Sequence, residues 1–173
     1  MLEGIRSLNN RRVLRRPGPA VSIREVEGEA DASKLRITVV CSRWNPTITD
    51  ALLASALSEL DRRGARPANI AVVRVPGAFE LPAAARLALA SKGCDAVIAL
   101  GAIVRGETTH HEILGHAVAT ALAALAGETG RPVGFGLLTC DTMEQARART
   151  GKGAEAAEAA VEMANLRRHF RER

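Results

Sequence analysis

The residues best suited to chemistry lie in segment 101–111, where an apolar stretch runs into Arg-Gly-Glu-Thr-Thr-His-His. The apolar stretch is typical of a buried strand, and an alanine-rich helical segment follows the histidines. Glu107 and Thr108 therefore stand near a predicted helix N-terminus, where backbone N–H groups and hydroxyls favour an anion such as phosphate. His110 stands beside this anion site and can exchange protons near neutral pH. The segment predicts acid–base chemistry on a small phosphorylated substrate.

The spacing of these residues argues against two other kinds of site. His111 and His116 are five positions apart, so at about 100° per residue their side chains diverge by about 140° on a helix. We therefore expect no metal site. The chain also lacks a GxxxxGK[ST] phosphate loop, and segment 101–106 does not match GxGxxG. Nucleotide hydrolysis and dinucleotide redox chemistry thus lack their main motifs.

Strands and helices are predicted to alternate along the chain. The pattern predicts strands over 35–41, 70–75, 94–100 and 133–138. It predicts helices over 79–90 and 109–126, a first helix capped within 47–50 and ending near Gly64, a short helix from a cap at 141–142 to Arg149, and a last helix ending near Arg168. Such alternation predicts an α/β fold, a flavodoxin-like three-layer αβα sandwich with a four-stranded parallel sheet. We expect residues 21–173 to form one domain, with 21–23 adding an edge strand, after a disordered basic extension over residues 1–20.

Composition narrows the class of protein. Of 173 residues, 47% are hydrophobic but only 2% are aromatic, so the core must consist of Ala, Val, Leu and Ile. Cys41, Cys94 and Cys140 show no ligand or disulfide spacing and are expected to be buried, reduced thiols. The longest apolar run, 117–126, is too short to span a membrane. No secretory segment is evident, and we expect a cytoplasmic protein.

The net charge of +5 is concentrated at the two ends of the chain. Five arginines lie in the first sixteen residues, and four lie between Arg167 and Arg173. Such arms can bind polyanions, and the N-terminal one also weakly resembles an organelle transit peptide. No aromatic residues are interleaved with them to stack on bases, so solvated tails are the favoured interpretation and no nucleic-acid partner is expected.

Four loops are predicted to converge, because the carboxyl ends of parallel strands share one edge of a sheet. These loops cover residues 42–45, 76–80, 106–110 and 138–142. Trp44 and Phe79 lie in the first two, and Phe135 lies in the strand that leads to the last. Aromatic residues gathered near one rim indicate a stacking surface for a flat heteroaromatic ring, although they could also simply plug the ends of the sheet.

Two charged residues near these loops have alternative interpretations. Glu80 could accept hydrogen bonds from ligand hydroxyls or could serve only the dipole of the helix that it begins. Arg149 could clamp a phosphate or could be a solvated surface residue.

Several segments, in order and together covering residues 22–170, resemble the lumazine synthase family. They are Ser-Arg-Trp-Asn at 42–45 with Ile-Thr at 48–49, Val-Pro-Gly-Ala-Phe-Glu-Leu-Pro at 75–82, Gly-Ala-Ile-Val-Arg-Gly-Glu-Thr-Thr-His at 101–110, Pro-Val-Gly-Phe-Gly at 132–136, the pieces 138–139, 141–142 and 144–146, and segments 152–157 and 162–166. The resemblance implies condensation of 5-amino-6-(ribitylamino)uracil with 3,4-dihydroxy-2-butanone 4-phosphate to 6,7-dimethyl-8-ribityllumazine, the penultimate step of riboflavin biosynthesis. It implies no metal and no organic cofactor.

The resemblance also implies roles for residues. His110 would transfer protons, Trp44 would stack on the pyrimidine, and Phe135 of a neighbouring subunit would line the other side. Glu107 and Thr108 would hold the phosphate opposite Arg149 of the adjacent subunit. The implied substrate-binding residues are Trp44, Asn45, Ala78, Phe79, Glu80, Ala102, Ile103, Val104, Glu107, Thr108, Phe135, Arg149 and Lys152.

The resemblance further implies a homo-oligomer, either a pentamer or a pentamer-based shell, with riboflavin synthase as a possible associate. One departure is that only two residues separate Arg149 from Lys152, fewer than in many members. The role of His111, which follows the proton-transfer histidine, is not assigned by the resemblance. A flavin- or lumazine-binding or shell-forming protein without turnover is the alternative from another class. A flavodoxin-like phosphosugar or nucleotide-modifying enzyme is a further alternative, but it leaves the clustered aromatics unexplained.

Overall fold

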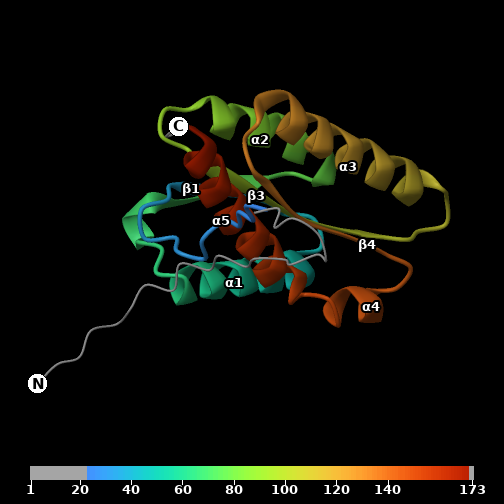
Figure 1. The fold of residues 1–173 in the computed structure, drawn as a ribbon. Coiled ribbons are helices and arrows are strands. Elements are labelled where there is room, and N and C mark those ends of the chain that lie inside the picture. Colours follow the sequence, from blue (N-terminus) through green and yellow to red (C-terminus); the bar gives the residue numbers. More distant parts are fainter. Residues whose placement is uncertain (1–22, 172–173) are drawn as a thin grey trace, which may run out of the picture.

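Strands rich in Val and Ile alternate with alanine- and leucine-rich helices in the computed structural model, which describes residues 23–171 (Figure 1). The elements are β1 (Ile37–Ser42), α1 (Pro46–Arg62), η1 (Pro67–Asn69), β2 (Ile70–Val75), η2 (Ala78–Glu80), α2 (Leu81–Ala90), β3 (Ala96–Val104), α3 (His110–Thr129), β4 (Val133–Cys140), α4 (Met143–Arg147) and α5 (Lys152–Arg171). The strands form a parallel sheet in the order β2-β1-β3-β4. The predicted α/β, flavodoxin-like sandwich is confirmed.

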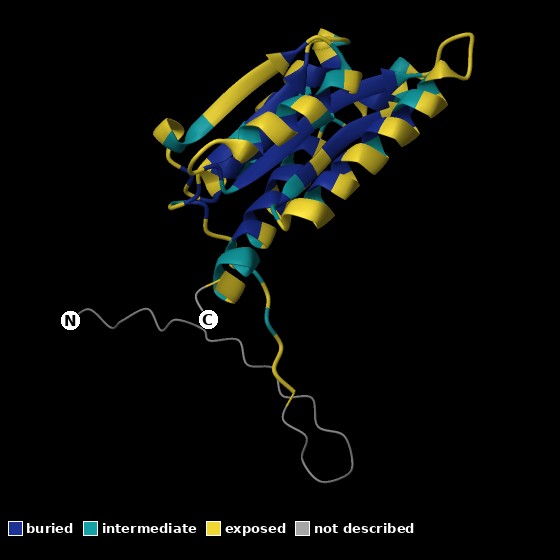
Figure 2. Cartoon of the chain, turned by 90° about the horizontal axis from the view of Figure 1, so that it is seen from above, coloured by how far each residue is buried: buried dark blue, intermediate teal, exposed yellow. Residues whose placement is uncertain are grey.

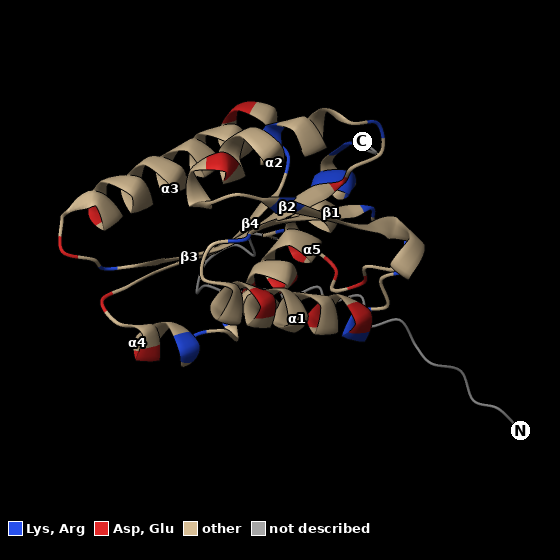
Figure 3. Cartoon of the chain, turned by 180° about the vertical axis from the view of Figure 1, so that it is seen from behind, with Lys and Arg blue, Asp and Glu red and all other residues tan. Residues whose placement is uncertain are grey.

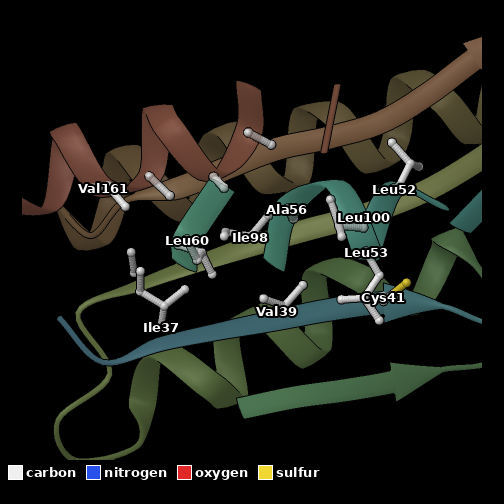
Figure 4. Packing of buried hydrophobic residues seen from close by; sticks show 14 of the residues in the cluster. Ile37, Val39, Cys41, Leu52, Leu53, Ala56, Leu60, Ile98, Leu100 and Val161 are labelled. Carbon is white, nitrogen blue, oxygen red and sulfur yellow. The ribbon is translucent and has the colours of Figure 1, made fainter. Parts of the chain in front are cut away.

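Helices cover both faces of the sheet, with α2 and α3 on one side and α1 and α5 on the other (Figure 1). Successive strand residues point to opposite faces, so each strand contributes to two cores. Val39 and Ile98 pack with Leu52 of α1 and Val161 of α5 (Figure 4). Val40 packs with residues of α2 and α3 on the opposite face. The inner strands are buried almost throughout, whereas the edge strand β2 is largely exposed (Figure 2).

Small residues let α5 approach its neighbours closely. A Cβ atom added at Gly153 would lie 2.0 Å from the Leu52 carbonyl oxygen of α1, and one added at Gly134 of β4 would lie 2.2 Å from the Ala156 carbonyl oxygen. Both distances are too short for a contact between a carbon atom and an oxygen atom that are not bonded to each other. The scarcity of aromatics and abundance of Ala and Gly thus translate into tight helix-on-sheet and helix-on-helix packing.

Several predicted elements begin or end at a different residue in the structure. The strand predicted over 94–100 begins two residues later and continues four residues further, to Val104. The first helix begins at Pro46 rather than after a cap within 47–50, because a proline is tolerated at the first helical position. Its N-cap, Asn45, makes no capping bond with its side chain. The predicted cap at 141–142 is confirmed, since the Thr142 hydroxyl accepts from the Gln145 backbone N–H at 3.2 Å.

The predicted basic C-terminal tail is largely part of a helix, because α5 extends to Arg171. Arg168 donates to the Asp95 carboxylate at 2.9 Å and to the Lys34 carbonyl, so this residue ties the end of α5 to the start of the sheet. Stretches of the ribbon coloured for Lys and Arg lie near this end of the chain (Figure 3). The interpretation of Arg168 as a solvated arginine is therefore wrong.

Some expectations fall partly or wholly outside the described residues. The predicted basic extension over 1–20 lies outside them, as do the first two residues of the edge strand predicted over 21–23; Ile23 belongs to no strand. The three cysteines are buried as predicted, and each is free. None of the helices within 23–171 is long and apolar enough to cross a membrane.

Candidate functional site

Loops that follow three neighbouring strands enclose a cavity of about 420 Å³ at the carboxyl edge of the sheet. Its walls come from the segments after β1 and β2, from the end of β3 with its following turn, and from the first residues of α3. The lining residues are Trp44, Asn45, Gly77, Ala78, Phe79, Ala102, Ile103, Val104, Gly106, Thr108, His110, His111 and Leu114. The fourth loop predicted to converge here, 138–142, contributes no lining residue.

The floor of the cavity exists because β3 is longer than β1. The two strands pair from Ile37 with Ala96 to Cys41 with Leu100, and β3 then runs on to Val104. The backbone of residues 102–104 consequently has no β1 partner on that side. Such a free strand edge offers N–H and C=O groups to a ligand.

Asn45 takes up one of these backbone groups. Its side-chain Nδ2 donates to the Ala102 carbonyl oxygen at 3.0 Å, although Ala102 is only 3% exposed. Its backbone is in the left-handed region, with φ of 57°. The side-chain amide therefore occupies the place that another residue of β1 would have filled, and it anchors the segment that carries Trp44.

Two of the three predicted aromatics reach the cavity. Trp44 and Phe79 line it yet remain 72% and 70% exposed. A plug at the end of a sheet would be covered on all sides, so the exposure favours a stacking surface over the plug interpretation. Phe135, the third residue of β4, pairs with Ala99, is half-exposed, and lies outside this cavity.

The turn at 105–109 forms the polar wall of the cavity. The His110 backbone N–H lies 3.4 Å from the Thr108 hydroxyl oxygen, and His111 Nδ1 lies 3.0 Å from the Thr108 carbonyl oxygen. His110 begins α3 and is exposed, whereas the His111 side chain is only 10% exposed. A proton carrier thus stands next to a turn at the N-terminus of a long helix, where an anion is favoured.

Three charged residues of the predicted site bond elsewhere in their own chain. Glu80 Oε2 accepts from the Gly77 N–H at 2.8 Å, so it shapes the turn before α2 and does not line the cavity. Arg149 lies beyond the end of α4 and donates to the Gln145 carbonyl at 3.0 Å. Lys152 pairs with Glu155 at 2.5 Å.

The predicted site residues thus fall into two groups. Those in the cavity wall are Trp44, Asn45, Ala78, Phe79, Ala102, Ile103, Val104, Thr108 and His110. Those outside it are Glu80, Glu107, Phe135, Arg149 and Lys152. Four lining residues were not predicted: Gly77, Gly106, His111 and Leu114. Leu114 could have been found from helical spacing, since it lies four residues after His110 on the same face of α3.

His111 and His116 diverge on α3 as their spacing predicts, one facing the cavity and the other exposed. Within residues 23–171 no three side chains of His, Cys, Asp or Glu are grouped so that they could hold a metal ion.

Comparison with known proteins places the chain in a family. The family model for 6,7-dimethyl-8-ribityllumazine synthase matches residues 34–168. A protein of that name from Desulfotalea psychrophila is 45% identical over 146 residues, which is 82% of this chain and 94% of the relative. Relatives of the same name from Kosmotoga olearia and Nitratidesulfovibrio vulgaris are 44% and 43% identical, covering 86% and 81% of this chain and 98% and 93% of their own lengths.

The matched range contains the whole sheet, every lining residue of the cavity and all the motifs at the strand ends. The chain therefore belongs to the 6,7-dimethyl-8-ribityllumazine synthase family and is a transferase.

Proposed function

We propose that this chain condenses 5-amino-6-(D-ribitylamino)uracil with 3,4-dihydroxy-2-butanone 4-phosphate to 6,7-dimethyl-8-ribityllumazine, releasing phosphate and water, as a cytoplasmic step of riboflavin biosynthesis. The observation that carries the proposal is one cavity with an aromatic rim on one side and an anion-suited turn with a histidine on the other. These two halves correspond to a flat ring and a phosphorylated ketone.

The ring substrate fits the half formed by Trp44, Phe79 and the free edge of β3. An exposed indole and an exposed phenyl ring offer faces on which a pyrimidine can stack. Apart from the Ala102 carbonyl, which Asn45 occupies, the edge of β3 at 102–104 that β1 leaves unpaired can offer backbone groups to the N–H and C=O groups of a uracil. Ala78 leaves room for a ribityl chain beside Phe79.

The phosphorylated ketone fits the other half. Thr108 supplies a hydroxyl and backbone groups at the start of α3, and Glu107 belongs to the same exposed turn. His110 follows directly and can accept and return protons. Amine attack on the ketone, loss of water, removal of a carbon-bound proton and departure of phosphate all require proton transfer near this position.

A neighbouring copy of the chain is proposed to complete each site. Phe135 and Arg149 lie outside the cavity of their own chain. Both remain exposed, and Leu87 of α2 and Ile113 of α3 are 74% and 66% exposed. Burial of these apolar side chains against a second chain would favour association. We propose a homopentamer, alone or within a larger shell, in which Phe135 and Arg149 of one chain reach the cavity of the next; Lys152 could join them, and riboflavin synthase is a candidate associate.

Much of the rate is expected to come from holding two reactive substrates together, without a metal or organic cofactor. The test mixes the purified protein with both substrates and follows the lumazine product by absorbance together with phosphate release. Product formation above the spontaneous background, lowered by Arg149→Ala, supports the proposal. Arg147→Ala is the matched control, because Arg147 is exposed and pairs with Glu144.

Background-level product from a folded oligomer would refute catalysis. Titration of that oligomer with riboflavin and the lumazine product would then test the alternative of a binding protein.

A further inference from the structure

His111 has a largely buried polar side chain in the cavity wall, and it has not yet been given a role. It lies in the first turn of α3, its side chain is 10% exposed, and its ring lines the cavity beside His110. Its Nδ1 lies 3.0 Å from the Thr108 carbonyl oxygen. A carbonyl oxygen can only accept, so Nδ1 carries the proton of this bond. The other ring nitrogen, Nε2, lies 3.8 Å from Oε1 of Glu112.

The start of the turn is held to β4, because the Arg105 N–H donates to the Cys140 carbonyl at 2.9 Å and the Arg105 guanidinium pairs with Asp141 at 3.6 Å. The rest of the turn is more open. Residues 105–109 are all exposed, and a Cβ atom added at Gly106 would meet nothing within 4 Å. The bond between the Thr108 hydroxyl and the His110 N–H is long, at 3.4 Å. Within residues 23–171, His111 therefore supplies the side-chain hydrogen bond that fixes the Thr108 carbonyl.

Fixing that carbonyl also fixes a donor. In a trans peptide the C=O of Thr108 and the N–H of Thr109 point in opposite directions within one rigid plane. With the carbonyl bonded to His111, the Thr109 N–H is directed away from the imidazole. A backbone N–H in this position is the kind of group that binds phosphate at a helix N-terminus.

We propose that His111 is a positioning residue that orients the Thr108–Thr109 peptide group for the phosphate of the substrate. The inference rests on the proposed function for the identity of the phosphorylated substrate. The geometry on which it stands is independent of turnover.

The test compares His111→Phe, which keeps a planar ring but removes the donor, with His111→Asn, whose side-chain Nδ2 can replace Nδ1. His116→Phe is the matched control, because His116 is exposed on another face of α3. We expect His111→Phe to raise KM for the phosphorylated butanone about three- to tenfold, the effect of one lost hydrogen bond. The KM for the uracil substrate and kcat should change less than about twofold, and His111→Asn should restore most of the loss.

Equal KM values for His111→Phe and the wild-type protein would overturn the inference. Equal impairment of His111→Phe and His111→Asn would also overturn it, because ring packing rather than the hydrogen bond would then be responsible.

A second measurement separates this inference from the proposed function. Amide hydrogen exchange at 106–109 should be faster in His111→Phe than in the wild-type protein and should return toward wild type in His111→Asn. Binding of inorganic phosphate, followed by ³¹P NMR, should weaken in the same order. If the wild-type protein shows no turnover but these differences remain, the proposed reaction is wrong and the positioning role stands; if the differences are absent, the positioning role is wrong.

Discussion

Replacing Asn45 tests how the cavity is built, because this residue combines a left-handed backbone with a side-chain bond to β3. Three substitutions separate the two contributions. Asn45→Gly keeps the backbone conformation and removes the bond, whereas Asn45→Ala removes the bond and strains the backbone. Asn45→Asp keeps the shape but places a carboxylate oxygen against the Ala102 carbonyl.

The magnitudes follow from the contacts. Loss of the 3.0 Å bond to a carbonyl of a residue only 3% exposed should cost about 1–2 kcal/mol in Asn45→Gly and in Asn45→Ala. Alanine at a φ of 57° adds strain of about 1–2 kcal/mol. Glycine instead adds freedom to the unfolded chain, worth about 0.5–1 kcal/mol. Asn45→Ala should therefore be the less stable of the two by about 0.5–1 kcal/mol.

Urea unfolding at a fixed protomer concentration, followed by far-UV circular dichroism, measures these differences. The fluorescence of Trp44, the one tryptophan of the chain, reports on the cavity in the same samples. Asn45→Asp should be at least as destabilised as Asn45→Gly, because the introduced carboxylate oxygen and the Ala102 carbonyl oxygen are both acceptors and repel each other. If Asn45→Gly proves as unstable as Asn45→Ala, the backbone argument is refuted. Unfolding midpoints that all match the wild-type protein would refute the role of the hydrogen bond.

Three further predictions concern catalysis, packing and acid stability. His110→Ala should leave reduced but measurable single-turnover formation of product, and complete loss with intact folding would contradict a mainly positioning catalyst. Gly153→Ala should destabilise the fold by about 1–3 kcal/mol in urea, because the added carbon would lie 2.0 Å from the Leu52 carbonyl oxygen; Gly151→Ala, with open space around it, is the control. Hydrogen bonds from Arg62 and Arg63 lower the pKa of Glu59 to about 2, so its contribution to stability is complete above the ordinary pKa of 4.5 and is lost as pH falls through about 2. Glu59→Gln should consequently lower the urea midpoint at pH 7, and the difference from the wild-type protein should shrink toward pH 2; a constant difference would show that this ionisation is not responsible.

Local patterns were sufficient to predict most elements and the edge of the sheet that carries the site. The apolar runs at 70–75 and 133–138 are strands, and Pro82 lies in the first turn of α2 as a proline must. The Thr142 cap was likewise predicted from residue type. These features depend on interactions between residues a few positions apart.

The same patterns could not predict where elements end when distant segments decide it. The strand β3 continues to Val104 because β4 pairs with it as far as that residue. Local sequence alone would instead favour a turn from Gly101. The Asn45 side chain bonds to Ala102 of β3, fifty-seven residues away in sequence, instead of capping the first helix. Arg168 is held by Asp95 across a similar separation.

The sequence by itself determined the fold class, the convergence of Trp44, Phe79 and His110, and the family, because residue types, periodicity and motif order are written along the chain. Only the tertiary structure decided that Glu80 lies outside the cavity of its own chain and that His111 lies within its wall. Those outcomes depend on strand lengths, helix rotation and hydrogen bonds between remote segments. Such quantities are fixed by packing in three dimensions and leave no local mark in the sequence.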